Sequence, residues 1–377
     1  MTEDDMANVR GLFVCLMTLP TIQANGLSTQ ISRNTSTLIP KTFNGKTYKW
    51  SYTNQLPASF NNLTNPPLLD VSPNDPAAAY TRGALSTQVI PSLYSLAMVL
   101  GIPSNTYILA FLRVKARCST AVLYLSLALS DLLLLLSLPL RIHYHLNGNH
   151  WIFGEVTCRV ITALFYANIY CSANTIACIS LKRYLAVSRP FLYRRLPKTT
   201  LALGACLGVW LPFGAAVVPE LLVRQSYQLP QLGVTTCHDV LPLKESSHTL
   251  LVSYRLILVC TGFIVPFLVC ICAHVGMMYH LGRSSCNWKP FIRVSSLVLL
   301  IFMVCFSPSA ILHIAHYIHL FFHGDDRLYG YYKVAVCLCC FHSCLDPFLC
   351  ILMSKTTASK LQFIPLHGTT QRPSVMI

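Results

Sequence analysis

Seven apolar stretches dominate the sequence, and each is close to the ~20 residues that an α-helix needs to cross a bilayer. The loops that join them are short, so the helices must pack against one another. The sequence therefore predicts an all-α membrane protein whose residues 88–354 form a seven-transmembrane helix bundle. The stretches cover residues 88–112, 121–146, 156–188, 201–222, 250–280, 290–321 and 329–354.

The charged residues fit a chain that is solvated by lipid. Only 11% of the residues are charged, whereas soluble domains carry about 25%. The net charge of +15 does not indicate nucleic-acid binding, because the basic residues lie in short loops, where anionic inner-leaflet lipid is their expected partner. The N-terminus is then extracellular and residues 355–377 form a cytoplasmic tail. The orienting residues are Arg113, Lys115, Arg117, Arg189, Arg194, Arg195, Lys198, Arg283, Lys289 and Lys355.

The segment before the first apolar stretch is read as secreted and unstructured. Residues 1–24 resemble a signal peptide, with Arg10 before a short apolar run that cannot span a bilayer. Residues 25–85 are rich in Asn, Thr, Ser and Pro and lack a helical or strand period, which predicts a disordered extracellular segment. Asn34 and Asn62 begin glycosylation sequons.

Polar and kinked positions recur in order along the seven stretches. Over about 250 residues they resemble the rhodopsin-like G-protein-coupled receptors, which live in the plasma membrane. The string TTCHDV before the fifth stretch is similar to the proteinase-activated receptors within that class, as are YHLNGNHWIFGE and CLDPFL. The positions that carry the wider resemblance are Asn105, Asp131, Cys158, Arg183, Trp210, Pro266, Pro308, Asp346 and Pro347.

The resemblance gives the early string LIPKTFNG a meaning, because it is similar to the cleavage site of a thrombin-cleaved family member. A serine protease would cut Lys41–Thr42, removing residues 25–41 as a propeptide. Lys41 suits a trypsin-like pocket, and Pro40 pre-sets the extended backbone that proteases bind. Thrombin is the first candidate and another trypsin-like protease the alternative. The competing reading is that any lysine in an exposed segment is cleavable, as Lys46 and Lys49 would be.

Cutting would expose a new N-terminal ligand within the extracellular segment 42–87. It comprises Thr42, Phe43, Asn44, Gly45 and Lys46. Its amine, with a pKa of about 7.7–8.0, is largely protonated at blood pH. Asp239 is a candidate counter-charge for this amine or for Lys46, with His238 as a neighbouring polar contact. The alternative is that Asp239 only caps a hairpin.

The family resemblance also assigns structural and switch residues. Cys158 and Cys237 are expected on the oxidising face and would form a disulfide. Asp131, with Asn105 and Asp346 as expected neighbours, could hold a sodium ion, or could be a protonated structural acid. Pro308 and Pro347 would bend their helices as hinges, although prolines are common in such helices. The spacing of the cysteines does not predict a zinc site.

Two departures on the cytoplasmic side leave the signalling role open. Lys182 stands where the family class usually places an acid before Arg183, and Cys350 replaces a tyrosine. The first hypothesis is a thrombin-cleaved receptor with a tethered ligand and a heterotrimeric G protein as partner. The second is a thrombin-docking cofactor that signals poorly and assists a partner proteinase-activated receptor in a hetero-oligomer. A transporter is disfavoured because no inverted repeat is visible, and nothing indicates an enzyme.

Overall fold

The computed structural model describes most of the bundle and several segments at its outer end. The described residues belong to one compact unit. The predicted signal peptide, the sequons at Asn34 and Asn62, and the predicted cleavage bond between Lys41 and Thr42 lie outside them. The described residues are 43–47, 67–71, 76–113, 119–242, 254, 257–283, 289–323 and 328–361.

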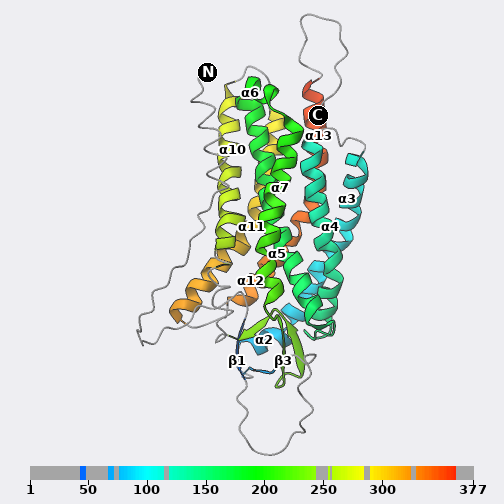
Figure 1. The fold of residues 1–377 in the computed structure, drawn as a ribbon, viewed down its shortest axis with the longest axis vertical. Coiled ribbons are helices and arrows are strands. Elements are labelled where there is room, and N and C mark those ends of the chain that lie inside the picture. The colour runs from blue at the N-terminus through cyan, green and yellow to red at the C-terminus, as the bar shows by residue number, and fades with distance from the viewer. Residues whose placement is uncertain are drawn as a thin grey trace, which may run out of the picture. The chain divides into compact units, whose positions relative to one another are not determined.

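Seven helices in this part of the chain are long and apolar enough to cross a membrane, which confirms the predicted fold. Figure 1 shows them side by side. Most predicted bounds differ from the structure by a few residues, because the apolar run fixes which part of a helix can lie in lipid. The spans are Leu85–Leu112, Ser119–Leu146, Gly154–Ser188, Lys198–Leu222, Ile257–Gly282, Phe291–His316 and Tyr329–Leu352.

The bundle has an aromatic interior and an apolar outer surface. The side chains on the outside of the bundle are apolar and do not bond to water, so lipid is the solvent that suits them. The largest fully buried side chains include Tyr94, Phe165, Phe302, Phe306 and Tyr329. Side chains exposed by more than half include Val99, Leu136, Leu211, Val304 and Ile311.

Helix α5 lies at the centre of the packing, in contact with α4, α7 and α10. Helix α3 packs on α4 and α13, and α11 packs on α12 and α13. The π-helical turns η1 and η2 lead into α3 and α10. The helical elements are α2 (Pro76–Arg82), η1 (Leu85–Val89), α3 (Ile90–Arg113), α4 (Ser119–Leu146), α5 (Gly154–Ser188), α6 (Pro190–Arg195), α7 (Lys198–Ala216), α8 (Val218–Leu222), η2 (Cys260–Ile264), α10 (Val265–Gly282), α11 (Lys289–His323), α12 (Tyr329–Cys340) and α13 (His342–Leu361).

The seventh span is built from two helices that meet at a turn at Phe341. Pro347 lies inside α13, and a proline cannot donate a hydrogen bond to the carbonyl four residues earlier, here that of Ser343. Asn105 Nδ2 donates to that carbonyl instead, at 2.6 Å. Asn105 thus ties α3 to the bend in the seventh span. Pro308 likewise lies inside α11.

Short strands gather at the outer end, at the bottom of Figure 1. Strands β3 and β4 form an antiparallel hairpin with Ser226 opposite Cys237. A second sheet has the order β2–β1–β5, with β1 antiparallel to β2 and parallel to β5. The strands are β1 (Phe43–Thr47), β2 (Leu69–Asp70), β3 (Ser226–Leu229), β4 (Val234–Cys237) and β5 (Val240–Pro242).

Some of these elements lie within the segment 25–85, for which the sequence predicts no regular structure. Within the described stretches of that segment the chain forms β1, β2 and α2. The sequence lacks a local period there because β1 takes its hydrogen bonds from β5, a strand nearly two hundred positions further along the chain. Pairing over such a distance leaves no periodic signal in the segment itself.

Candidate functional site

A disulfide fixes the loop between the fourth and fifth spans to the start of α5. Cys158, in the first turns of α5, bonds to Cys237 at the end of β4, with 5.8 Å between the two Cα atoms. Both side chains are buried. The bond confirms the predicted pair and holds the β3–β4 hairpin at the outer end of the bundle.

The segment that the sequence predicts as the ligand forms β1 and lies on this loop. Its pairing with β5 begins at Phe43, opposite Val240, and continues through the next two residues. On its other side, Lys46 and Thr47 pair with β2. The backbone of the predicted ligand is therefore the middle strand of a three-stranded sheet, and one neighbour in that sheet is the extracellular loop.

The chain that follows β1 also rests on the loop. The backbone N–H of Gln228 in β3 donates to the carbonyl of Pro67 at 3.0 Å. Leu69 and Val71 are buried in the main hydrophobic core. The described residues 67–71, which lie between the predicted ligand and the first span, are thus attached to the loop and to the core.

His238 is part of the packed interior. It is 1% exposed, and its backbone has a φ of 66°, a left-handed value that is uncommon outside glycine. Its Nδ1 lies 2.5 Å from Gln225 Oε1, and its Nε2 lies 3.2 Å from the Tyr166 hydroxyl. The side chain therefore links β4 to α5, and a contact with the ligand would require it to exchange these partners.

Asp239 is buried in an ion pair with the seventh span. It is 1% exposed, and Lys333 Nζ on α12 lies 2.6 Å from its Oδ1. The hydroxyls of Tyr144 and Tyr329 donate to its two oxygens at 2.7 and 3.1 Å. The carboxylate thus joins the loop to α4 and α12, an arrangement that neither the counter-charge reading nor the hairpin-cap reading included.

The charge of Lys333 decides the protonation of this acid. Burial by itself raises the pKa of the Asp239 carboxyl, because a low dielectric disfavours the charged form. The positive charge of Lys333, together with hydrogen bonds from Lys333 and Tyr144, outweighs burial, so the pKa lies below its ordinary value. Asp239 is therefore a carboxylate at neutral pH.

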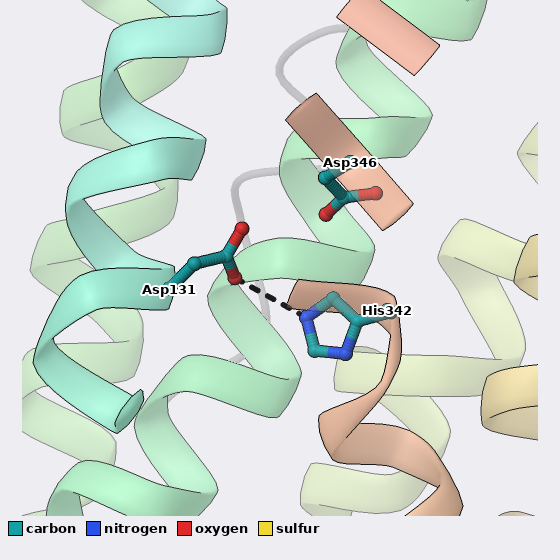
Figure 2. A group of neighbouring side chains, drawn as sticks. All are labelled: Asp131, His342 and Asp346. Carbon is teal, nitrogen blue, oxygen red and sulfur yellow. Dashed lines mark ion pairs between the residues drawn. The ribbon is translucent and has the colours of Figure 1, made fainter. Parts of the chain in front are cut away.

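A second cluster lies in the middle of the bundle, where Asp131, His342 and Asp346 come together (Figure 2). All three are buried, and their ligand atoms lie within 4.8 Å of one another. His342 Nε2 is 3.4 Å from Asp131 Oδ1, which also accepts a hydrogen bond from Ser343 Oγ at 2.9 Å. The expected neighbour Asp346 is confirmed.

Several buried oxygen atoms in and around this cluster accept no hydrogen bond from the described residues. Asp131 Oδ2, Asp346 Oδ2 and the side-chain oxygens of Asn105 and Asn168 are buried and lack a hydrogen-bond partner within the described residues. Asn105 was expected beside Asp131, but its amide nitrogen is turned toward the backbone of Gly101 and Ser343. Buried oxygens in this state need a proton, a water or a cation.

At the cytoplasmic end, two basic residues of α5 hold the start of α4. Arg183 Nη2 donates to the hydroxyl of Tyr124. Lys182 Nζ donates to the hydroxyls of Ser119 and Thr120, each at 2.7 Å. The lysine that replaces the usual acid therefore has its own partners on α4. Cys350, which stands where this class of receptors usually has a tyrosine, is buried.

Two residues of these sites were missed by sequence reasoning, namely Lys333 and His342. Both are ionisable and lie inside the seventh apolar stretch. An ionisable residue within a membrane span is rare and marks a functional site by default. The sequence therefore carried a signal for both residues.

Comparisons with known proteins agree with this architecture. Residues 105–349 match the family model described as 7 transmembrane receptor (rhodopsin family). The chain is 43% identical over 279 residues to proteinase-activated receptor 3 of Homo sapiens, covering 74% of each protein. It is 41% identical over 293 residues to proteinase-activated receptor 3 of Bos taurus, covering 78% of each. It is also 35% identical over 287 residues to proteinase-activated receptor 2 of Rattus norvegicus, covering 74% of this chain and 72% of that protein.

The family model covers most of the membrane spans together with the loop that carries Cys237 and Asp239. Seven spans and this ancestry make the chain a multi-pass protein of the plasma membrane, and a receptor rather than an enzyme. The chain belongs to the proteinase-activated receptors, within the rhodopsin family of seven-transmembrane receptors.

Proposed function

We propose that a protease cuts this receptor after Lys41, and that the new terminus, Thr42 to Lys46, acts as a tethered ligand that switches the bundle toward G-protein coupling. The observation that carries the proposal is the pairing of β1 with β5. A free strand that adds to a sheet is held by main-chain hydrogen bonds, a common mode of peptide recognition. The ligand segment already lies beside the loop on which it would act.

Thrombin is the protease we propose first. Lys41 follows Pro40, and an extended, proline-fixed backbone before a basic residue suits a trypsin-like cleft. The aromatic residues after the site are not accompanied by acids between positions 46 and 60. We therefore expect thrombin to recognise the residues around the bond itself, without help from a basic exosite on the protease.

A second function is favoured by the cytoplasmic contacts. Lys182 and Arg183 both hold α4, so the inner face has two links that must break before a G protein can enter. A receptor held in this way would be cut yet signal weakly. It would then act as a docking cofactor that presents thrombin to a partner proteinase-activated receptor in a hetero-oligomer.

We further propose that the buried acid cluster binds a sodium ion. The unpaired oxygens of Asp131, Asp346 and Asn105 are hard ligands of the kind that such a cation takes. His342 contacts the other oxygen of Asp131 and leaves these three available. The ion would neutralise part of the charge of two carboxylates that lie close together in a low dielectric.

The tethered-ligand proposal is tested by supplying the ligand in trans. Cells that express a Lys41→Ala receptor, and no other receptor of this family, are given the peptide TFNGK or the sequence-swapped control FTNGK. We expect a calcium response to TFNGK alone, because the substitution blocks cutting and leaves the loop intact. A receptor that ignores both peptides at normal surface levels would contradict the ligand role.

A further inference from the structure

The acid nearest to the docked strand already has a cation. Asp239 directly precedes β5, the strand that pairs with β1. Its carboxylate is paired with Lys333 Nζ at 2.6 Å, and both side chains are buried. The pair therefore joins the docking strand to α12, the outer half of the seventh span.

The strand register places the ligand segment beside the residue that follows the same acid. Phe43 lies opposite Val240, and the two strands run parallel. In the sequence, Thr42 directly precedes Phe43, and Asp239 directly precedes Val240. Thr42 is the residue whose amine cleavage would create, and that amine is a second cation for one carboxylate.

We propose that Lys333 is a built-in substitute for the ligand's amine, which holds the seventh span to the loop until the amine replaces it at Asp239. The inference rests on the proposed tethered-ligand function. Lys333 would then determine which cation pairs with Asp239. We call the Lys333–Asp239 ion pair the latch, because it would hold the seventh span to the loop. The ligand class that the site takes is a peptide with a free, protonated N-terminus.

A second cation at this one carboxylate would leave an excess of buried positive charge. Arg141 on α4 adds another buried positive charge at the same end, with its guanidinium carbon 4.5 Å from the centre of the Phe165 ring. Buried like charges repel strongly because water does not screen them. The long stem of Lys333 allows its ammonium to turn outward to solvent once the amine is bound.

Release of Lys333 would free α12 at its outer end. Helix α12 leads through Phe341 directly into α13, which carries His342 and Asp346 of the buried acid cluster. A rotation of α12 would therefore be passed to the acid cluster and to the bend at Pro347. This gives a continuous physical path from the cut terminus to the middle of the bundle.

The test separates the two halves of the ion pair. In the Lys41→Ala background we would compare Lys333→Met, Lys333→Arg and Asp239→Asn at matched surface levels. The readouts are calcium signalling without ligand, and the binding of TFNGK that carries a dye on its lysine, with and without N-terminal acetylation. Arg141→Met is the matched control, because it removes a buried cation that makes no ion pair with Asp239 in the described part of the chain.

Both pair-breaking variants should raise signalling without ligand, on the order of tenfold, while Lys333→Arg and Arg141→Met should not. Their effects on binding should be opposite. Lys333→Met should bind the free-amine peptide more tightly than the parent, whereas Asp239→Asn should lose the preference for a free amine. If the two variants change binding in the same direction, or neither changes the ligand-free signal, the proposal is overturned.

A second variant keeps the test decisive if Lys333→Met does not reach the cell surface. The charge swap Lys333→Asp with Asp239→Lys preserves an ion pair, so it should restore a low ligand-free signal while abolishing the free-amine preference. A swap with a high signal, or with the parent's preference, contradicts the latch. If the parent binds no TFNGK at all, the tethered-ligand function itself fails, and this is distinguishable from a failure of the latch alone.

Discussion

At the scale of single residues, Asp239 shows how a buried charge is kept. Its pKa is lowered because the stabilisation by Lys333 outweighs the cost of burial. A group whose pKa is lower in the folded state adds stability above its unfolded pKa, about 3.9 for Asp, and loses it as the pH falls through the folded value. The ion pair should therefore be intact at neutral pH and lost only in strong acid.

This sign gives a prediction for purified receptor. The melting temperature of Lys333→Met should lie below that of the wild type, because breaking a buried pair costs about 3–5 kcal/mol. The difference should hold from pH 7 to about 4 and fade below that. A difference that faded near pH 6 would contradict the assignment to Asp239. The groups that face Asp239 are Tyr80, Tyr144, His145, Tyr329, Lys333 and Cys337.

The proposed sodium site gives a second residue-scale prediction. Any ion that binds only the folded receptor stabilises it, by about 1.4 kcal/mol at ten times its Kd. The melting temperature should therefore be higher in sodium chloride than in choline chloride at equal ionic strength. Asp131→Asn should remove the difference, and the control His342→Asn should keep it. Equal melting temperatures for the wild type in the two salts would rule out the ion.

The role of a residue could be predicted from the sequence where a local sequence motif indicates that role. Cys158 and Cys237 are an example, since they are the cysteines expected outside the apolar runs on the oxidising face. Lys333 and His342 were missed because their roles depend on which helix faces them, Asp239 coming from a loop and Asp131 from α4. A sequence shows that a charge is buried, but only packing shows its partner.

At the scale of elements, the docking of β1 rests on backbone pairing. The ligand should therefore tolerate changes of side chain at Asn44 better than changes of backbone. The peptide TFAGK should keep most of the potency of TFNGK, whereas TFPGK should lose about tenfold or more, because proline removes a backbone donor and restricts φ in the strand. Calcium dose–response curves measure both. Equal potency of the two variants would contradict strand pairing.

Elements that depend only on their own sequence were predicted, whereas elements that depend on distant contacts were missed. Spans such as Ser119–Leu146 were predicted closely because lipid selects for apolar length, a property of each segment alone. Strands β1 and β2 were missed because each is short and is stabilised by the loop, not by its own sequence. The same holds for α2, whose Ala77 and Ala78 are buried against the rest of the outer end.

At the scale of the whole molecule, the described contacts form two attachments that a signal must loosen. One is at the outer end, where Lys333 joins the loop to the seventh span. The other is at the cytoplasmic end, where Arg183 and Lys182 hold α4. Whether loosening the first also loosens the second decides between an autonomous receptor and a docking cofactor.

The most direct test follows cutting and signalling in one experiment. An epitope tag is placed after the predicted signal peptide, and thrombin is added to cells without other thrombin receptors. Tag loss and cytosolic calcium are recorded for the wild type and Lys41→Ala. We expect tag loss with a calcium rise, both abolished by the substitution. Tag loss without calcium would favour the cofactor role. Retention of the tag by the wild type, or a calcium rise in Lys41→Ala, would contradict activation by thrombin cleavage at this bond.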